Sequence, residues 1–185
     1  TRKRVMNILF KLACYIKMPV VVAFSCSEDS KFEEFLSLII KDNFSISKSK
    51  TFFSPFKNDI LLFQGSVAPF NYSKKPVLVL NDLENMVNNF PSNGFVLTDF
   101  SKSKNIEGDF TVNSVGFTDS SSLWISDLII NSETNFKVNY GGDSVPFWIK
   151  DSLSQEELID LLLAIRVSMI LGLNLIQISQ SLDNT

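Results

Sequence analysis

The residues best placed to do chemistry lie in one short segment, Ser25-Cys26-Ser27-Glu28-Asp29-Ser30-Lys31. The segment follows an unbroken apolar run, Val20 to Phe24, and precedes a stretch in which apolar residues recur at helical spacing. A loop in this place wraps phosphate groups when glycines let its backbone amides approach them and a lysine neutralises their charge. This segment contains no glycine, and Glu28 and Asp29 would repel a triphosphate. We therefore interpret these positions as a vestigial phosphate loop that does not hold ATP.

Cys26 is a candidate nucleophile within this segment, because a thiol at the start of a helix can be activated there. Activation usually also needs a histidine as base, and the sequence contains no histidine. We therefore interpret Cys26 as a small packing residue. The lack of histidine and the total of two cysteines also exclude Ser-His-Asp, Cys-His and zinc sites. We expect no catalytic residue, no metal ligand and no cofactor.

Three pairs of acidic residues could in principle form an acid–base pair or a cation site: Glu28 and Asp29, Glu33 and Glu34, and Asp82 and Glu84. Carboxylates in the first turn of a helix are stabilised by the helix dipole and are commonly just solvated there. We interpret all three pairs in this way.

Two tryptophans and one glycine pair could have either a structural or a functional role. Trp124 and Trp148 could stack on a base or a sugar, but they lie in alternating apolar stretches, which favours packing in the core or on a sheet face. Gly141-Gly142-Asp143 is typical of a hairpin turn rather than of a phosphate-binding nest. We favour the structural role for each.

The composition describes one ordinary domain that can bury a substantial core. Of its 185 residues, 45% are hydrophobic and 17 are phenylalanine. A net charge of -3 leaves no basic surplus for a phosphate backbone, so nucleic acid is not expected as a partner. The sequence has no apolar run of the roughly 18 to 20 residues that span a bilayer, so no membrane insertion is expected. With no signal-peptide pattern and only Cys14 and Cys26, we expect a cytoplasmic protein.

The first half of the chain alternates helices and strands, which is typical of an open, mainly parallel sheet. Helical spacing predicts a helix that ends at about Lys17, ahead of Pro19, and a second helix at about Ser30 to Lys41. Short apolar runs predict strands at Val20–Phe24, Ile60–Phe63, Val77–Leu80 and Phe95–Thr98, with a helix at Asp82–Asn89 between the last two.

The second half changes at about residue 109 to alternating stretches, which predict antiparallel hairpins with turns at Ser132–Asn135 and at Gly141–Asp143. Ser154 to Glu157 is a capping box that starts a long helix ending at Gly172, and Asn174 can cap a last helix. We expect a single domain, 1–185, with a parallel α/β part at 1–108, a small antiparallel sheet at 109–150 and C-terminal helices at 151–185.

Several segments, taken in order, resemble the central, ATP-binding domain of the Mur ligases, and most of all the branch that adds D-alanyl-D-alanine. Their residues are Met18-Pro19-Val20-Val21-Val22-Ala23-Phe24, Phe90-Pro91-Ser92-Asn93-Gly94-Phe95-Val96-Leu97 and Leu171-Gly172-Leu173-Asn174-Leu175-Ile176-Gln177-Ile178. In the family these segments match a proline and valine-rich strand before the phosphate loop, an "L-P-x-x-G-x-x-V-L-N" strand entry and an "L-G-[VL]-S-x-E-x-I" helix start. The resemblance implies a phosphate-loop-type α/β fold and a link to the peptidoglycan ligases that build the cell wall.

The departures from the family pattern fall on the residues that carry its chemistry. Cys26 and Asp29 stand where the family has glycines, and Ser30 stands where it has lysine. Phe63 stands where the family has a magnesium-binding glutamate, and the family's histidine and modified lysine have no counterpart. The resemblance therefore implies a degenerate domain without catalysis.

We expect this domain to act as a scaffold or binding module whose partner is another protein or a flanking domain. Two alternatives stay open. The chain could be part of a divergent ATP-dependent peptidoglycan ligase whose missing groups come from other domains or a partner. It could also bind a small ligand or a nucleotide sugar at the ends of its parallel strands, where open α/β sheets bind ligands.

Overall fold

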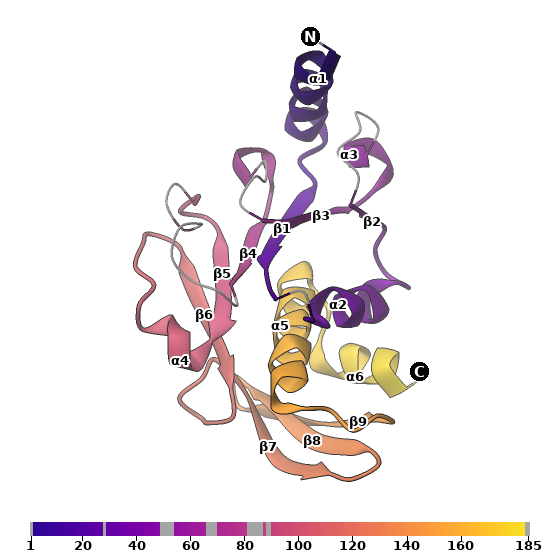
Figure 1. Cartoon of the computed structure of the whole chain (residues 1–185), viewed down its shortest axis with the longest axis vertical. Coiled ribbons are helices and arrows are strands. Elements are labelled where there is room, and N and C mark those ends of the chain that lie inside the picture. The colour runs from indigo at the N-terminus through magenta and orange to yellow at the C-terminus, as the bar shows by residue number, and fades with distance from the viewer. Residues whose placement is uncertain are drawn as a thin grey trace.

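The computed structural model describes residues 2–27, 29–48, 54–65, 70–80, 87 and 90–183, without the side chains of residues 2–4 and 6. The strands of this described part form a single nine-stranded sheet in the order β2-β3-β1-β4-β5-β6-β7-β8-β9, with helices on both faces (Figure 1). The expected α/β architecture with a mainly parallel sheet is confirmed.

The strands of the parallel part are β2 (Ile46–Ser47), β3 (Ile60–Gln64), β1 (Val20–Ser25), β4 (Pro76–Leu80), β5 (Phe95–Asp99) and β6 (Thr111–Gly116). β1 lies between β3 and β4, with Val22 in register with Leu62 on one side and with Val77 on the other. Its first five residues are buried, which is why the strand reads as a continuous apolar run.

Sequence patterns missed two of these strands, β2 and β6. β2 has only two residues, too few to produce a pattern. β6 carries Asn113 and Ser114, polar residues that are nevertheless buried because β6 pairs with β5 on one side and β7 on the other. A strand that is buried because it pairs with distant strands need not show an apolar pattern in its own sequence.

The antiparallel strands are β7 (Leu123–Ile130), β8 (Thr134–Tyr140) and β9 (Asp143–Ile149). The hairpins expected in this half are confirmed, and the turn between β8 and β9 uses positive φ angles at Gly141 and Gly142. They do not form a sheet of their own, however, and the region 109–150 begins with the parallel strand β6. β7 pairs with the otherwise free edge of β6 and runs parallel to it from Leu123. The antiparallel strands therefore belong to the same hydrogen-bonded sheet.

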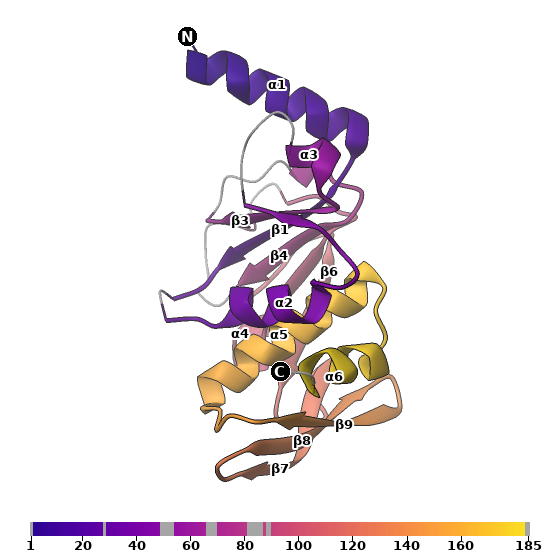
Figure 2. The same cartoon turned by 90° about the vertical axis from the view of Figure 1, so that its right-hand side faces the viewer.

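Helices α2 (Phe32–Ile40), α5 (Gln155–Leu171) and α6 (Leu175–Asp183) share one buried cluster with alternate residues of the strands (Figure 2). Helix α1 (Arg2–Lys17) contributes Phe10 and Cys14 to a second cluster on the other face. Three short pieces, α3 (Ser54–Lys57), η1 (Phe70–Tyr72) and α4 (Phe100–Ser103), lie in connections. The helix expected at 82–89 falls outside the described residues except for Val87.

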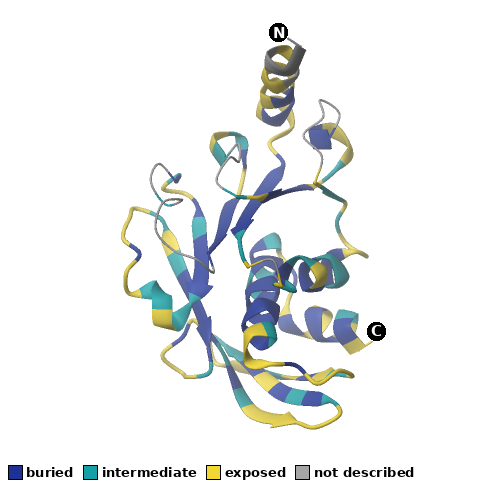
Figure 3. Cartoon of the chain, in the orientation of Figure 1, coloured by how far each residue is buried: buried dark blue, intermediate teal, exposed yellow. Residues whose placement is uncertain are grey.

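The predicted helix ends of the C-terminal part are confirmed. The Ser154 hydroxyl accepts from the Glu157 amide at 3.3 Å, and the Glu157 carboxylate accepts from the Ser154 amide at 2.7 Å. Gly172 ends α5 with a φ of 114°, a conformation that favours glycine. Asn174 caps α6 by accepting from the Gln177 amide at 2.9 Å. These caps hold α5 across the parallel strands, with its buried residues spread along most of its length (Figure 3).

Candidate functional site

The segment of residues 25–31 leaves the carboxyl end of β1 and leads into α2. After β1 the chain continues to β2 and β3 on one side, and later to β4 on the other. Such a switch point opens a crevice at the carboxyl ends of the strands in α/β proteins, and ligands commonly bind there. The topology therefore places the loop where an anion-binding loop would be useful.

A buried carboxylate from another helix meets the start of α2. The backbone amide of Lys31, the N-cap residue of α2, donates a hydrogen bond of 2.9 Å to Oδ2 of Asp160. Asp160 lies in the second turn of α5 and is only 3% exposed. The amide at the positive end of α2 is thus bound to an acid of the chain itself, in the kind of place where a phosphate loop binds its ligand.

The environment of Asp160 has opposing effects on its charge. Burial raises the pKa of the Asp160 carboxyl, while hydrogen bonds from the Ser30 hydroxyl and the Lys31 amide act in the opposite direction. The net direction is upward because burial has the largest effect. Oδ1 of Asp160 is buried and has no hydrogen-bond partner among the described residues. The carboxylate is therefore only partly compensated.

The side chain of Lys31 binds a second carboxylate of α5. Its ammonium lies 2.6 Å from Oε1 of Glu157. This contact raises the pKa of Lys31, while Lys31 and the Ser154 amide lower the pKa of Glu157 to about 2. Glu157 therefore serves both as a cap of α5 and as the partner of Lys31. The one lysine of residues 25–31 is therefore paired with an acid of the same chain.

The remaining loop positions are placed as follows. Ser25 ends β1, and the Cys26 side chain is partly buried against the main core. Ser27 and Asp29 are exposed, and the Ser27 carbonyl accepts from the Ser30 amide at 3.1 Å. Glu28 lies outside the described residues. The structure thus brings Ser30 and Lys31 to α5 and leaves Ser27 and Asp29 toward solvent.

Sequence reasoning missed the role of Asp160 altogether and identified Glu157 only as a capping residue. A usable signal was present for Asp160, since it is an acid within the apolar run Leu158 to Ile165. A charged residue in such a run is rarely buried without a partner. The pattern could not, however, say which backbone group the partner would be.

A second polar cluster joins α5 to the sheet. The guanidinium of Arg166 donates two hydrogen bonds to Oδ1 of Asn113 on β6, at 3.1 and 2.7 Å, and lies 4.5 Å from the ring centre of Tyr140 on β8. Burial lowers the pKa of Arg166. These contacts tie the helix to both parts of the sheet, and sequence patterns did not point to them.

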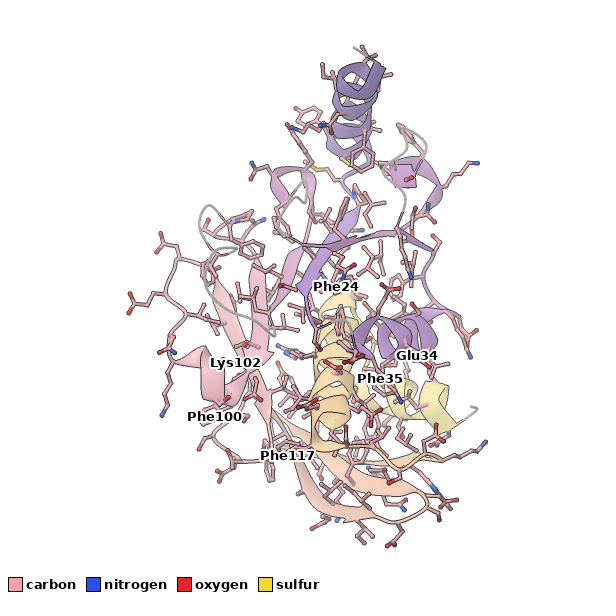
Figure 4. The ribbon with its side chains drawn as sticks, viewed as in Figure 1. Phe24, Glu34, Phe35, Phe100, Lys102 and Phe117 are labelled. Atoms are coloured by element: carbon pink, nitrogen blue, oxygen red, sulfur yellow. The ribbon has the colours of Figure 1, made fainter. Side chains whose placement is uncertain are left out.

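The other acidic pairs do not assemble a site. Glu33 forms an ion pair with Lys48, and Glu34 is exposed. Figure 4 labels Glu34 on α2 together with Phe35 of the same helix, and it also labels Phe24 on β1, Phe100 and Lys102 on α4, and Phe117 after β6. Asp82 and Glu84 lie outside the described residues. Within the described part, there is no group of three or more histidine, cysteine, aspartate or glutamate side chains that could hold a metal.

The two tryptophans differ in exposure. Trp124 on β7 is half-buried, whereas Trp148 on β9 is exposed on the sheet and donates a hydrogen bond of 2.9 Å from Nε1 to Glu133. Among the described helices, none is long and apolar enough to cross a bilayer.

No family model and no curated protein matches this sequence. Solved structures do share its fold. A crystal structure of MurF from Acinetobacter baumannii superposes with a TM-score of 0.72 at 10% identity, over 97% of this chain and 49% of that one. MurF ligase from Thermotoga maritima in complex with ADP gives a TM-score of 0.65 at 14% identity, over 94% of this chain and 52% of that one.

A mutant of FPGS from L. casei gives a TM-score of 0.63 at 7% identity, over 97% of this chain and 66% of that one. The chain thus spans about half the length of the MurF structures that it matches. Identities this low show the fold alone. The nine-stranded sheet with its flanking helices is therefore a Mur-ligase-like fold.

Proposed function

We propose that this chain is a degenerate Mur-ligase-like domain that has lost its ATP site and acts as a non-catalytic scaffold or binding module. The observation that carries the proposal is the bond between the Lys31 amide and the buried carboxylate of Asp160. An acid of the chain already binds the amide at the start of α2.

The negative charge of the Asp160 carboxylate would repel a nucleotide phosphate at the start of α2. Two like charges about 4 Å apart repel by about 4 kcal/mol at an effective dielectric constant of about 20, which is about a thousandfold in affinity. Protonation of Asp160 would remove its charge but would leave the Lys31 amide occupied. Glu157, whose pKa is held low, would still neutralise the Lys31 ammonium.

Other positions support the same proposal. Phe63, which stands at the glutamate position of the resembling family, is buried, and its ring packs edge-on against Phe10 at a centroid distance of 6.3 Å. The sequence has no histidine for the metal that the family uses. The position where the resembling family has an ionic group is therefore part of the hydrophobic core in this chain.

Calorimetric titration with ATP and magnesium tests the proposal. We expect no saturable binding at millimolar ATP. Micromolar affinity that is lost when the loop is changed by Lys31→Ala would overturn the proposal and favour the alternative of a divergent ATP-dependent amide ligase. That alternative rests on the shared fold with MurF, since the chain covers about half of those structures.

A second arm tests the role of Asp160 directly. Inorganic pyrophosphate should not raise the melting temperature of the native chain, but it should stabilise Asp160→Ala, because that substitution frees the Lys31 amide. The matched control is Glu156→Ala, an exposed acid one turn earlier on the same helix. Equal responses of the two variants would contradict the assignment of Asp160 as an internal replacement for an anion. Binding of UDP-sugars in a parallel thermal-shift screen would favour the small-ligand alternative.

A further inference from the structure

Helix α1 presents apolar residues on two faces. On one face, Phe10, Ala13 and Cys14 are buried, and Phe10 packs against Phe63 of β3. This face attaches the helix to the rest of the molecule. The other face also carries apolar residues at helical spacing, and the structure leaves it uncovered.

The uncovered face is an aliphatic stripe, which we define as Val5, Ile8, Leu9, Leu12 and Ile16. Each of these side chains is between 37% and 66% exposed. At about 100° per residue, the five positions fall within an arc of about 100°. Tyr15 lies at one margin of the stripe and contacts Tyr72 edge-on at 6.2 Å, where the helix meets the body. In Figure 3, much of the described part of this helix is coloured as exposed.

The charge of this segment is opposite to that of the rest of the chain. Residues 1–27 contain five basic residues, Arg2, Lys3, Arg4, Lys11 and Lys17, and no acidic residue. The remaining residues contain 12 basic and 20 acidic ones, a net charge of -8, because the whole chain has 17 and 20. By helical position, the exposed Lys11 borders the stripe.

We propose that α1 docks this protein onto the surface of an anionic lipid bilayer. Helices with an aliphatic stripe bordered by cations lie in the plane of the interface, with the stripe in the acyl boundary and the cations at the lipid headgroups. The 16-residue helix does not need to span the membrane for this role. We infer a bilayer rather than another partner because an anionic lipid surface complements the basic residues of this segment.

The position of the helix allows a flat surface to reach it. α1 projects at the end of the molecule that lies opposite the β7–β9 strands, and both views agree on this (Figures 1 and 2). A second copy is a poorer occupant, because it would bring two helices with five cations each against one another.

Co-sedimentation of the 185-residue chain with lipid vesicles tests the proposal. The protein should bind vesicles of phosphatidylcholine with phosphatidylserine and should bind far less to phosphatidylcholine alone. Raising the ionic strength from about 0.01 M to about 1 M should release it, because the Debye length falls from about 30 Å to about 3 Å. Leu12→Gln and Ile8→Gln should each weaken partitioning by about tenfold, since each removes one buried aliphatic side chain from the interface.

Matched controls separate the stripe from general hydrophobicity. Ile176→Gln on α6 and Ile129→Gln on β7 also remove exposed aliphatic side chains, at 59% and 56% exposure, and should leave vesicle binding unchanged. Circular dichroism would verify that each variant is folded. The proposal is overturned if anionic and neutral vesicles bind equally, or if neither binds. It is also overturned if Leu12→Gln instead abolishes a dimer seen by analytical ultracentrifugation.

Discussion

Two acids of α5, one turn apart, have opposite electrostatic roles. Glu157 is ionised readily because Lys31 and the Ser154 amide bind its carboxylate. Asp160 is ionised reluctantly because burial outweighs its hydrogen bonds from Ser30 and Lys31. Both hold α2 to α5, so the start of α2 depends on charges that respond to pH in opposite directions.

Asp160→Asn should remove one component of the pH dependence of stability. Because the folded pKa of Asp160 is above its ordinary 3.8, the folded state binds more protons than the unfolded state in that window. Its contribution to stability therefore falls as pH rises from below 3.8 through the folded pKa. Urea unfolding at a series of pH values should show this fall in the native chain and not in Asp160→Asn. Parallel pH profiles of the two proteins would refute the assignment.

Glu157→Gln should show the opposite trend. The folded pKa of about 2 lies below the ordinary 4.5, so the ionised carboxylate stabilises the fold above 4.5 and loses this effect as pH falls toward 2. Since Lys31 is 43% exposed, solvent screens its ion pair with Glu157. We therefore expect Glu157→Gln to lower the free energy of unfolding at neutral pH by only about 1 kcal/mol. Urea denaturation would measure it, with Glu156→Gln as the exposed control. A loss that persists unchanged at pH 2 would contradict this explanation.

Helix α5 organises the fold because it contacts α2, α6 and the sheet. Its start is fixed by the capping box at Ser154, and its end by Gly172 in the left-handed conformation. Between these ends, eleven of its residues are buried, so it is apolar around most of its circumference. A helix with so little polar surface must be covered, and the strands, α2 and α6 cover it.

Ser154→Ala should destabilise the protein by about 1 kcal/mol, because the Glu157 amide loses its acceptor at the start of α5. Thermal unfolding followed by circular dichroism would measure the change. Ser152→Ala is the matched control, since Ser152 is exposed and lies outside the cap. A similar loss in both variants would show that the cap is not its source.

The described strands form one continuous sheet, although they change from parallel to antiparallel. The main core cluster runs through both parts, from Val22 and Leu62 to Ile125 and Phe147. Arg166 adds polar contacts with β6 and β8 at the junction. Parts that share a core and a hydrogen-bonded edge should unfold together.

Both tryptophans of the chain lie in the antiparallel strands, at Trp124 and Trp148. Their fluorescence therefore reports on this part, while far-UV circular dichroism reports on the whole chain. In urea, the two signals should give the same midpoint and the same slope. An earlier fluorescence transition would mean that β7–β9 unfold as an independent unit, against the structure of a shared core.

Local patterns predicted the elements whose signals lie within a few residues. The run at Val20–Phe24, the capping box at Ser154 and the turn at Gly141 each depend on neighbours in the chain, and each is confirmed. The lack of glycine in residues 25–31 is likewise visible in the sequence alone. These features follow from backbone sterics and short-range hydrogen bonds, which the sequence specifies directly.

The tertiary structure alone decided what now binds to the start of α2. Lys31 and Asp160 are 129 residues apart, and Arg166 and Asn113 are 53 apart, so neither pair leaves a periodic signal. The burial of β6 and the exposure of the stripe on α1 were also hidden, because the same apolar or polar residue can face a partner or solvent. Which one it faces is set by the packing of distant elements, and only the folded chain brings them together.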